Sequence, residues 1–485
     1  METRLFPGIP GRGLRFALWV PVGHDSWINR AHSFSGRDLA YLGLITAAGV
    51  AVGIAGIRGY GYMGQDFVTH SSLVRSYPSG FSYALTNPPG LYWFGSLVLG
   101  AVGREHYLEA IALSFLLMNS AALWVLYGFL WKGISERPLR YAAAAFATLV
   151  PFRVIHSVVL ASDALTFPIF ALAALFALLL YENPRSTVSW AGLALSLTAG
   201  MFCKYTFVGL LPPVALLLAA AIARRLTGAS RLRWGAVGVL ALALLTAAFL
   251  LQIRETRRLK GDVATGQWLP AGAPAVMRWS DILLPQRSDL GLFRAPGYLS
   301  GKLYGFRNFS YMGLLHVASF CDVLDIFQAP AGSVPQDWGH RTQVPFARRR
   351  TAASQALQEA SVRMGLAFSI LALVGTVACG VLGALSLLTG RPRIEDSTLV
   401  ITALAAGFYS TIFFSLNRLG DPYTPGFWLP RLVLPALLVF FCLGFVSLDL
   451  AFRRPGASGG WKGPVLWTAF SYTAAACLVF AGFLA

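Results

Sequence analysis

One stretch of the chain, which follows the first strongly apolar segment, carries several side chains that could do chemistry. A carboxylate there can take a proton from a hydroxyl, and nearby histidine, arginine, amide and phenol groups can bind a polar ligand. A single acid in a loop is equally well explained as a solvated surface group, so its neighbours decide the interpretation. The residues concerned are Asp66, His70, Arg75, Asn87 and Tyr92.

Further polar groups come from distant parts of the sequence. Asp163 begins one apolar segment, and Lys204 interrupts two others. Asp163 could simply cap a helix, and Lys204 could be an anchor at the membrane surface. Arg418 and Arg431 flank the start of a late apolar segment, where a ligand or a buried partner explains basic residues better. His156 is either a cavity residue or a packed histidine.

The elements that position these residues are apolar segments of membrane-spanning length. The chain has 485 residues, of which 56% are hydrophobic and only 12% charged. Soluble domains carry about 25% charged residues, so the composition predicts an all-α integral membrane protein. We expect about eleven spans, at 39–57, 108–130, 141–158, 164–181, 188–203, 206–223, 235–252, 364–388, 398–415, 431–450 and 464–484.

The distribution of basic residues predicts the sidedness of these spans. A further apolar piece at 88–102 is too short for a confident crossing and contains Pro and Gly at its start. If it lies along the surface, the arginines fall in alternate loops, as the positive-inside rule requires. The N-terminus is then cytoplasmic and the C-terminus extracytoplasmic. Asp66, Asp163 and Lys204 all come to the outer face.

Four regions follow from this assignment. Between the two membrane modules lies a long segment with mixed charge, Trp, Tyr and Pro, which we expect to be partly structured outside the membrane. The regions are a cytoplasmic segment 1–38, an N-terminal membrane module 39–252 with its first outer loop at 59–107, an extracytoplasmic loop 253–362 and a C-terminal membrane module 363–485.

The net charge of +18 does not indicate nucleic-acid binding. The arginines lie between apolar segments and form no basic stripe interleaved with exposed aromatic residues. The five cysteines show no zinc-like spacing. The lipid bilayer is therefore the expected partner, and no nucleic acid is expected.

An acid together with several cations at a membrane surface suits a site for an anionic lipid headgroup. The chemistry that fits is transfer of a sugar from a polyprenyl phosphate. Cations would stabilise the leaving phosphate, and a carboxylate would take the proton of the acceptor hydroxyl. A transporter or flippase for an anionic lipid-linked sugar, or a lipid-linked glycan polymerase or ligase, would also use such groups. The one-sided cluster, without paired broken helices, favours the transferase over transport.

Several motifs resemble the C-type glycosyltransferases, the GT-C fold. Within them, the similarity is to the dolichyl-phosphate-mannose protein mannosyltransferase and aminoarabinose-transferase-like group. The resemblance covers residues 39–225 well and 398–450 loosely. The motifs are GQDFVTH followed by TNPPGLYWFGSLV, then HSVVLASDALTFPIFALAALFAL, SLTAGMFCKYTFVGLLPPVALLL and, more weakly, WLPRLVLPALLVF.

The resemblance implies a GT-C-like fold with juxtamembrane helices in the first outer loop and a large extracytoplasmic loop. Asp66 matches the family's catalytic first-loop acid, Asp163 its second-loop acid, and Lys204 the lysine near the lipid phosphate. Phe67 stands where the family usually has a second acid, and Asn87 replaces a histidine. No cofactor is therefore predicted, and a divalent metal stays an open alternative.

These observations combine into one hypothesis for the reaction. Asp66 is the acceptor base, and Lys204 neutralises the donor phosphate together with Arg418 or Arg431. Asp163 orients the acceptor or a water molecule. The partners are a polyprenyl-phosphate sugar and a lipid, glycan or protein acceptor. The Ala/Gly/Arg-rich composition suggests a bacterial inner membrane.

Overall fold

The computed structural model describes residues 34–59, 63, 67–79, 88–260, 311–322, 351–419, 430–453 and 462–484. Helices and turns make up these ranges, which contain no strand. The helices are α2 (Gly36–Arg58), α3 (Phe67–Ser76), α4 (Gly90–Val102), α5 (Tyr107–Gly133), α6 (Arg137–Leu149), α7 (Pro151–His156), α8 (Asp163–Glu182), α9 (Thr187–Cys203), η1 (Tyr205–Leu210), α10 (Leu211–Arg225), α11 (Gly228–Lys260), α14 (Tyr311–Phe320), α15 (Ala352–Thr389), α16 (Asp396–Leu419), α17 (Pro430–Phe452) and α18 (Lys462–Leu484).

The predicted all-α membrane fold is confirmed over the described ranges. Nine of the eleven predicted spans each fall on a single helix, 206–223 falls on η1 and α10 together, and eight stretches are long and apolar enough to cross a membrane. α9 is apolar but shorter, as is α4. α4 is about 20 Å long at 1.5 Å per residue, which is too short for a hydrocarbon core of about 30 Å. The total of eleven spans stays a prediction.

One predicted span, 141–158, differs because it is divided into α6 and α7. Pro151 has no N–H group, so the helix cannot continue its ladder of hydrogen bonds through this position. The guanidinium of Arg153, which is completely buried, donates a hydrogen bond to the carbonyl of Thr148 in the last turn of α6. Arg153 therefore satisfies a backbone group that the break leaves exposed inside the bundle.

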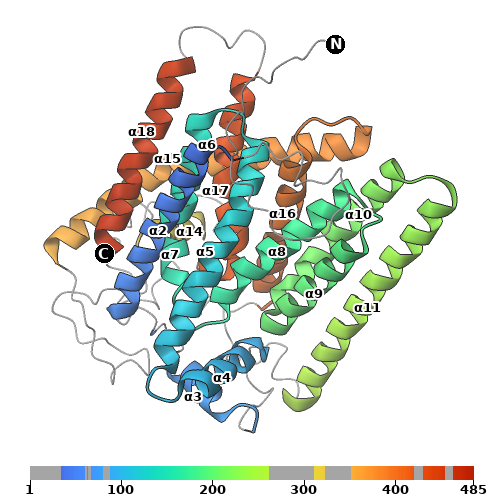
Figure 1. Cartoon of the computed structure of the whole chain (residues 1–485), viewed down its shortest axis with the longest axis horizontal. Coiled ribbons are helices and arrows are strands. Elements are labelled where there is room, and N and C mark those ends of the chain that lie inside the picture. The colour runs from blue at the N-terminus through green and yellow to red at the C-terminus, as the bar shows by residue number, and fades with distance from the viewer. Residues whose placement is uncertain are drawn as a thin grey trace, which may run out of the picture.

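Ion pairs at one end of the bundle join the loops that the sequence assigns to one face. They involve residues at the starts of α2, α6, α16 and α18 and at the ends of α5, α8 and α10, which lie at the same end of the bundle (Figure 1). This arrangement fits the predicted grouping of basic loops. The pairs are Asp38–Arg137 (3.2 Å), Lys132–Glu182 (2.9 Å), Arg225–Asp396 (3.0 Å) and Glu136–Lys462 (2.7 Å).

The opposite end of the bundle is covered by α3 and α4 (Figure 1). A small separate core joins these two helices to the first turns of α5 and α8 and to the end of α9. It contains Leu73, Val74, Leu91, Tyr92, Tyr107, Ile111, Phe115, Leu160, Ala164, Leu165 and Cys203. This satellite core fixes α3 and α4 against the helix ends that carry the candidate site.

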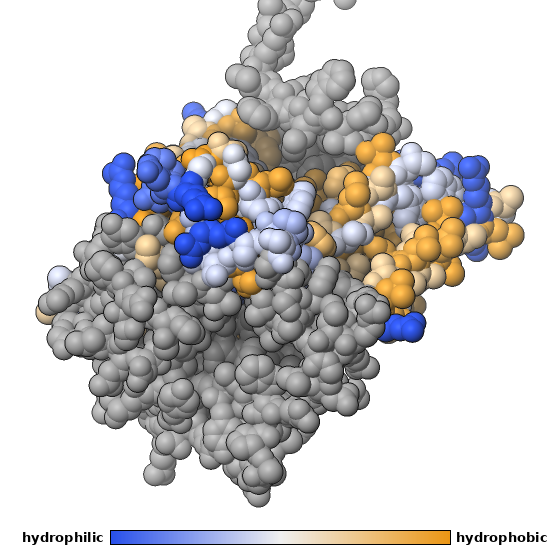
Figure 2. Space-filling view, turned by 90° about the horizontal axis from the view of Figure 1, so that it is seen from below, coloured by the Kyte–Doolittle hydropathy of each residue, from blue (hydrophilic) through white to orange (hydrophobic). Residues whose placement is uncertain are grey.

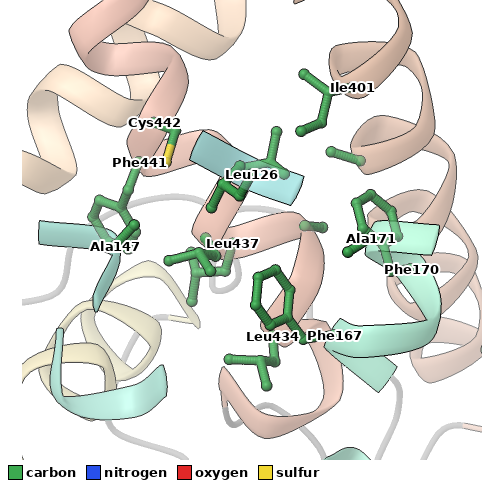
Figure 3. Close-up of a cluster of buried hydrophobic side chains, with 14 of the residues drawn as sticks. Leu126, Ala147, Phe167, Phe170, Ala171, Ile401, Leu434, Leu437, Phe441 and Cys442 are labelled. Atoms are coloured by element: carbon green, nitrogen blue, oxygen red, sulfur yellow. The ribbon is translucent and has the colours of Figure 1, made fainter. Parts of the chain in front are cut away.

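The main core lies between α5, α8 and α17 and their neighbours. In Figure 3 the side chain of Phe167 from α8 lies beside that of Leu434 from α17. The ring of Phe170 on α8 packs against that of Phe408 on α16, with centroids 5.9 Å apart. These side chains are nearly inaccessible to solvent. This packing fixes α8 along most of its length. The first turn of α8, which begins at Asp163, lies nearest the end of the bundle.

The described part of the predicted extracytoplasmic loop includes α14, which packs against the bundle. Phe320, at the end of α14, lies 5.5 Å from Phe441 and 5.8 Å from Phe480 between ring centroids. His316 contacts Ser369 Oγ at 2.8 Å. α15 already begins at Ala352, before the predicted start of the C-terminal module. A short helix of this loop thus packs into the bundle, because its aromatic and small residues find apolar partners there.

α11 stands at the edge of the bundle (Figure 1) and exposes a row of large aliphatic side chains. The surface on the corresponding side of Figure 2 is mostly hydrophobic. The stacked rings of Trp190 and Trp234, with centroids 6.4 Å apart, connect α11 to α9. Such an apolar, exposed face is expected of a helix in contact with lipid.

Candidate functional site

Asp163 and Lys204, two predicted site residues, form an ion pair. Lys204 Nζ donates a hydrogen bond to Asp163 Oδ1, and both side chains are largely buried, with 12% and 9% exposure respectively. Asp163 is the first residue of α8, and Lys204 follows the last residue of α9. The structure thus joins an acid and a cation for which the sequence predicted separate roles.

The backbone around Lys204 explains how α9 ends there. Lys204 is extended (φ −158°, ψ 129°), and its N–H donates to the carbonyl of Gly200 at 2.7 Å. The chain then folds back as η1, which brings the ring of Phe207 against Gly200. A Cβ atom at Gly200 would lie 2.2 Å from that ring, so only glycine fits. The tight turn holds Lys204 at the end of α9, opposite Asp163.

The Pro-Pro-Gly sequence at the start of α4 packs against the same helix end. A Cβ atom at Gly90 would lie 2.6 Å from Cys203 Sγ and 2.8 Å from the carbonyl oxygen of Phe202. The close approach requires glycine at this position. The predicted motif of the first outer loop and the Asp163–Lys204 pair therefore lie next to each other.

His70 and Tyr92 are also brought together. His70 Nδ1 lies 3.0 Å from the hydroxyl of Tyr92, and both side chains are almost fully buried. The contact joins α3 to α4 and belongs to the layer that covers the site. Their predicted role in binding substrate stays a prediction.

The other described candidates have different surroundings. Arg75 is exposed, and its Nε donates to the carbonyl of Ser71 on the same helix at 3.3 Å. His156 is buried at the end of α7, in the segment that leads to Asp163. Neither arrangement tests a role in substrate binding.

Four predicted residues cannot be placed in the site. Asp66 and Asn87 lie outside the described residues. Arg418 is in the last turn of α16 and Arg431 in the first turn of α17, but their side chains lie outside the description. Within the described ranges, no group of three or more His, Cys, Asp or Glu residues could hold a metal ion.

Asn119 is a residue of this region that the sequence interpretation missed. It is fully buried in α5, and its Nδ2 donates to the carbonyls of Ala164 (2.8 Å) and Phe115 (2.9 Å). An amide inside a predicted span is itself a signal, because polar side chains within membrane helices need a hydrogen-bonding partner.

Comparison with known proteins supports the motifs between residues 86 and 250, whereas GQDFVTH and WLPRLVLPALLVF lie outside the matched segment. Residues 86–250 match the family model described as dolichyl-phosphate-mannose-protein mannosyltransferase. Curated proteins gave no sequence match. Among solved structures, the Archaeoglobus fulgidus oligosaccharyltransferase in the apo form aligns with 13% identity and a TM-score of 0.42.

The alignment with that structure covers 92% of this chain and 56% of the archaeal protein, so the chain spans little more than half of the length of that protein. The segment matched by the family model begins just before α4 and includes Asp163 and Lys204. Over residues 86–250, the resemblance to the dolichyl-phosphate-mannose protein mannosyltransferase family is confirmed.

Proposed function

We propose that this protein is a membrane glycosyltransferase. It would move a sugar from a polyprenyl-phosphate donor to an acceptor hydroxyl at the extracytoplasmic face. The family match over residues 86–250 supports a glycosyltransferase in general terms. The observation that carries the proposal is the buried Asp163–Lys204 pair, which lies beside the start of α4 at the end of the bundle.

Lys204 would stabilise the donor's phosphate as it leaves. When the bond between the anomeric carbon and the phosphate oxygen breaks, the oxygen keeps the electron pair and gains negative charge. A cation held in place before the reaction lowers the energy of this state without rearranging. Arg418, in the last turn of α16, and Arg431, in the first turn of α17, are proposed to add positive charge there.

Asp66 is proposed as the base. Its carboxylate would take the proton of the acceptor hydroxyl while the acceptor oxygen bonds to the anomeric carbon. The products are the glycosylated acceptor and polyprenyl phosphate. Sequence reasoning gave Asp163 the task of orienting the acceptor or a water molecule, whereas the ion pair supports a role in fixing the ammonium of Lys204.

The same proposal includes an acceptor that is a lipid, a glycan or a protein. It also includes a location in a bacterial inner membrane. The orientation with a cytoplasmic N-terminus belongs to it as well. In that orientation the end of the bundle that carries α3 and α4 would face outward.

The experiment compares wild type with Asp66→Asn in lipid bilayers. Both would receive radiolabelled polyprenyl-phosphate sugars and an acceptor extract, and the release of polyprenyl phosphate would be measured. We expect the substitution to abolish release and to leave the unfolding temperature unchanged. Full activity of Asp66→Asn would remove Asp66 from the role of base.

A further inference from the structure

The first turn of α8 contains a backbone carbonyl that its own helix cannot satisfy. Pro168 lies inside α8 and has no N–H group, so the carbonyl of Ala164 lacks its usual helical donor. Ala164 is fully buried in the satellite core. An unpaired carbonyl in such an apolar interior is costly, so a donor from outside the helix is required.

Asn119 of α5 is that donor. Its Nδ2 lies 2.8 Å from the carbonyl of Ala164 and 2.9 Å from the carbonyl of Phe115. Two acceptors on one side fix the orientation of the amide, because a flipped oxygen would face both carbonyls. Over the described residues, Asn119 Oδ1 has no hydrogen-bond partner. The hydrogen bonds of this amide are therefore the two that its Nδ2 donates.

The contact is one residue away from the ion pair. Ala164 directly follows Asp163, whose carboxylate accepts from Lys204. Ser162, the residue before the helix, makes no side-chain capping bond. Bonds within the segment hold the first turn, such as those from the Ala164 N–H to the Ala161 carbonyl and from Thr166 Oγ1 to the Asp163 carbonyl. Asn119 adds a hydrogen bond to that turn from α5.

We propose that Asn119 is a positioning residue for the Asp163–Lys204 pair. By tying the first turn of α8 to α5, it directs the Asp163 carboxylate toward Lys204. Its consequence for turnover rests on the proposed function, because there Lys204 stabilises the donor phosphate. The geometric claim can be tested without turnover.

The test is a double-mutant cycle on the unfolding temperature of the full chain in lipid. Asp163→Asn, Lys204→Met and both together would be measured with Asn119 present and with Asn119→Leu. We expect a clear coupling between Asp163 and Lys204 with Asn119 present, and its loss in Asn119→Leu. A purely structural amide would lower all unfolding temperatures equally and leave the coupling unchanged, which would overturn the proposal.

Two further variants control this cycle. Ser120→Ala removes a neighbouring buried hydroxyl whose hydrogen bond, within the part of the chain that the structure describes, goes to the carbonyl of Leu116 on its own helix, so the coupling should persist. If Asn119→Leu does not fold, Pro168→Ala is added, because its N–H can satisfy the carbonyl of Ala164 within α8. The loss of coupling is still expected in this background, since the link to α5 stays broken.

A second readout uses release of polyprenyl phosphate. Asn119→Leu should slow release about tenfold in the wild-type background but have little further effect beside Asp163→Asn, as expected for residues that act together. Equal slowing in both backgrounds would contradict action through Asp163. If the wild type releases nothing, the proposed function fails, and the unfolding cycle alone still decides the role of Asn119.

Discussion

At the scale of single residues, the Asp163–Lys204 pair is the feature that most constrains the chemistry. Both side chains are largely buried, so removing one partner leaves the other charge uncompensated. For buried pairs this costs about 3 to 5 kcal/mol, far more than the loss of a surface ion pair. Substitutions of these residues therefore need a stability measurement beside each activity measurement.

The first prediction concerns Lys204→Met. Because the ammonium is proposed to meet the donor phosphate, this variant should need more donor for half-maximal release, with the acceptor dependence unchanged. Lys204→Arg keeps the positive charge but replaces the ammonium with a planar guanidinium. The donor concentration that it needs for half-maximal release should therefore fall between those of the wild type and Lys204→Met. The measurement is the initial release rate over a range of donor concentrations. An unchanged donor dependence in Lys204→Met would remove Lys204 from the phosphate site.

The second prediction concerns Asp163→Asn. If Asp163 acts by holding Lys204, the loss in release caused by Asp163→Asn and that caused by Lys204→Met should not add. The combined variant should be about as slow as Lys204→Met alone, because interacting residues show non-additive effects. Additive losses would indicate an independent role for Asp163, such as orienting the acceptor.

At the scale of elements, the site depends on the seating of α4 against the end of α9. Gly90 permits this approach, since a Cβ atom there would overlap Cys203 Sγ and the carbonyl of Phe202. The backbone oxygen cannot turn away as a flexible side chain could. Any larger residue must therefore move α4 away from the end of α9.

The third prediction is that Gly90→Ala destabilises the protein and slows release. Overpacking of this kind costs about 1 to 3 kcal/mol. Gly100→Ala on the same helix is the matched control, because nothing lies within 4 Å of its Cβ position. Unfolding temperature and release rate would be measured for both. Equal behaviour of the two variants would contradict the proposed contact.

Sequence patterns predicted most elements but not the contacts between them. The lengths of the apolar segments located the helices. The short length of 88–102, with Pro and Gly at its start, identified it as a segment that does not span the membrane. The division at Pro151 was missed because the apolar pattern continues across it. The sequence predicted that Lys204 neutralises the donor phosphate, but its ion pair with Asp163 depends on how α8 and α9 lie side by side. Spacing along the chain does not report that contact.

At the scale of the whole molecule, the two ends of the bundle differ in kind. One end collects ion pairs between the loops rich in arginine and lysine, and the other carries α3, α4 and the buried pair. This difference between the ends fits the predicted alternation of basic loops, and the placement of the two ends on opposite sides of the membrane stays a proposal.

The fourth prediction tests this orientation with a thiol reagent that does not cross membranes. The five native cysteines are buried, so single exposed cysteines can be introduced into the full chain. Arg104→Cys, beside α4, should react in intact cells, and Arg391→Cys, after α15, only once the membrane is opened. The reverse pattern would invert the proposed orientation.

The most direct test of the central claim is whether the wild-type protein transfers a sugar and releases polyprenyl phosphate. Purified protein in lipid would be given each of a small set of radiolabelled polyprenyl-phosphate sugars with cell-extract acceptors. The account predicts that at least one donor is converted to free polyprenyl phosphate, with its label passing to an acceptor. Tight binding of a donor without release, together with flux of that donor across vesicles, would contradict it and identify a transporter.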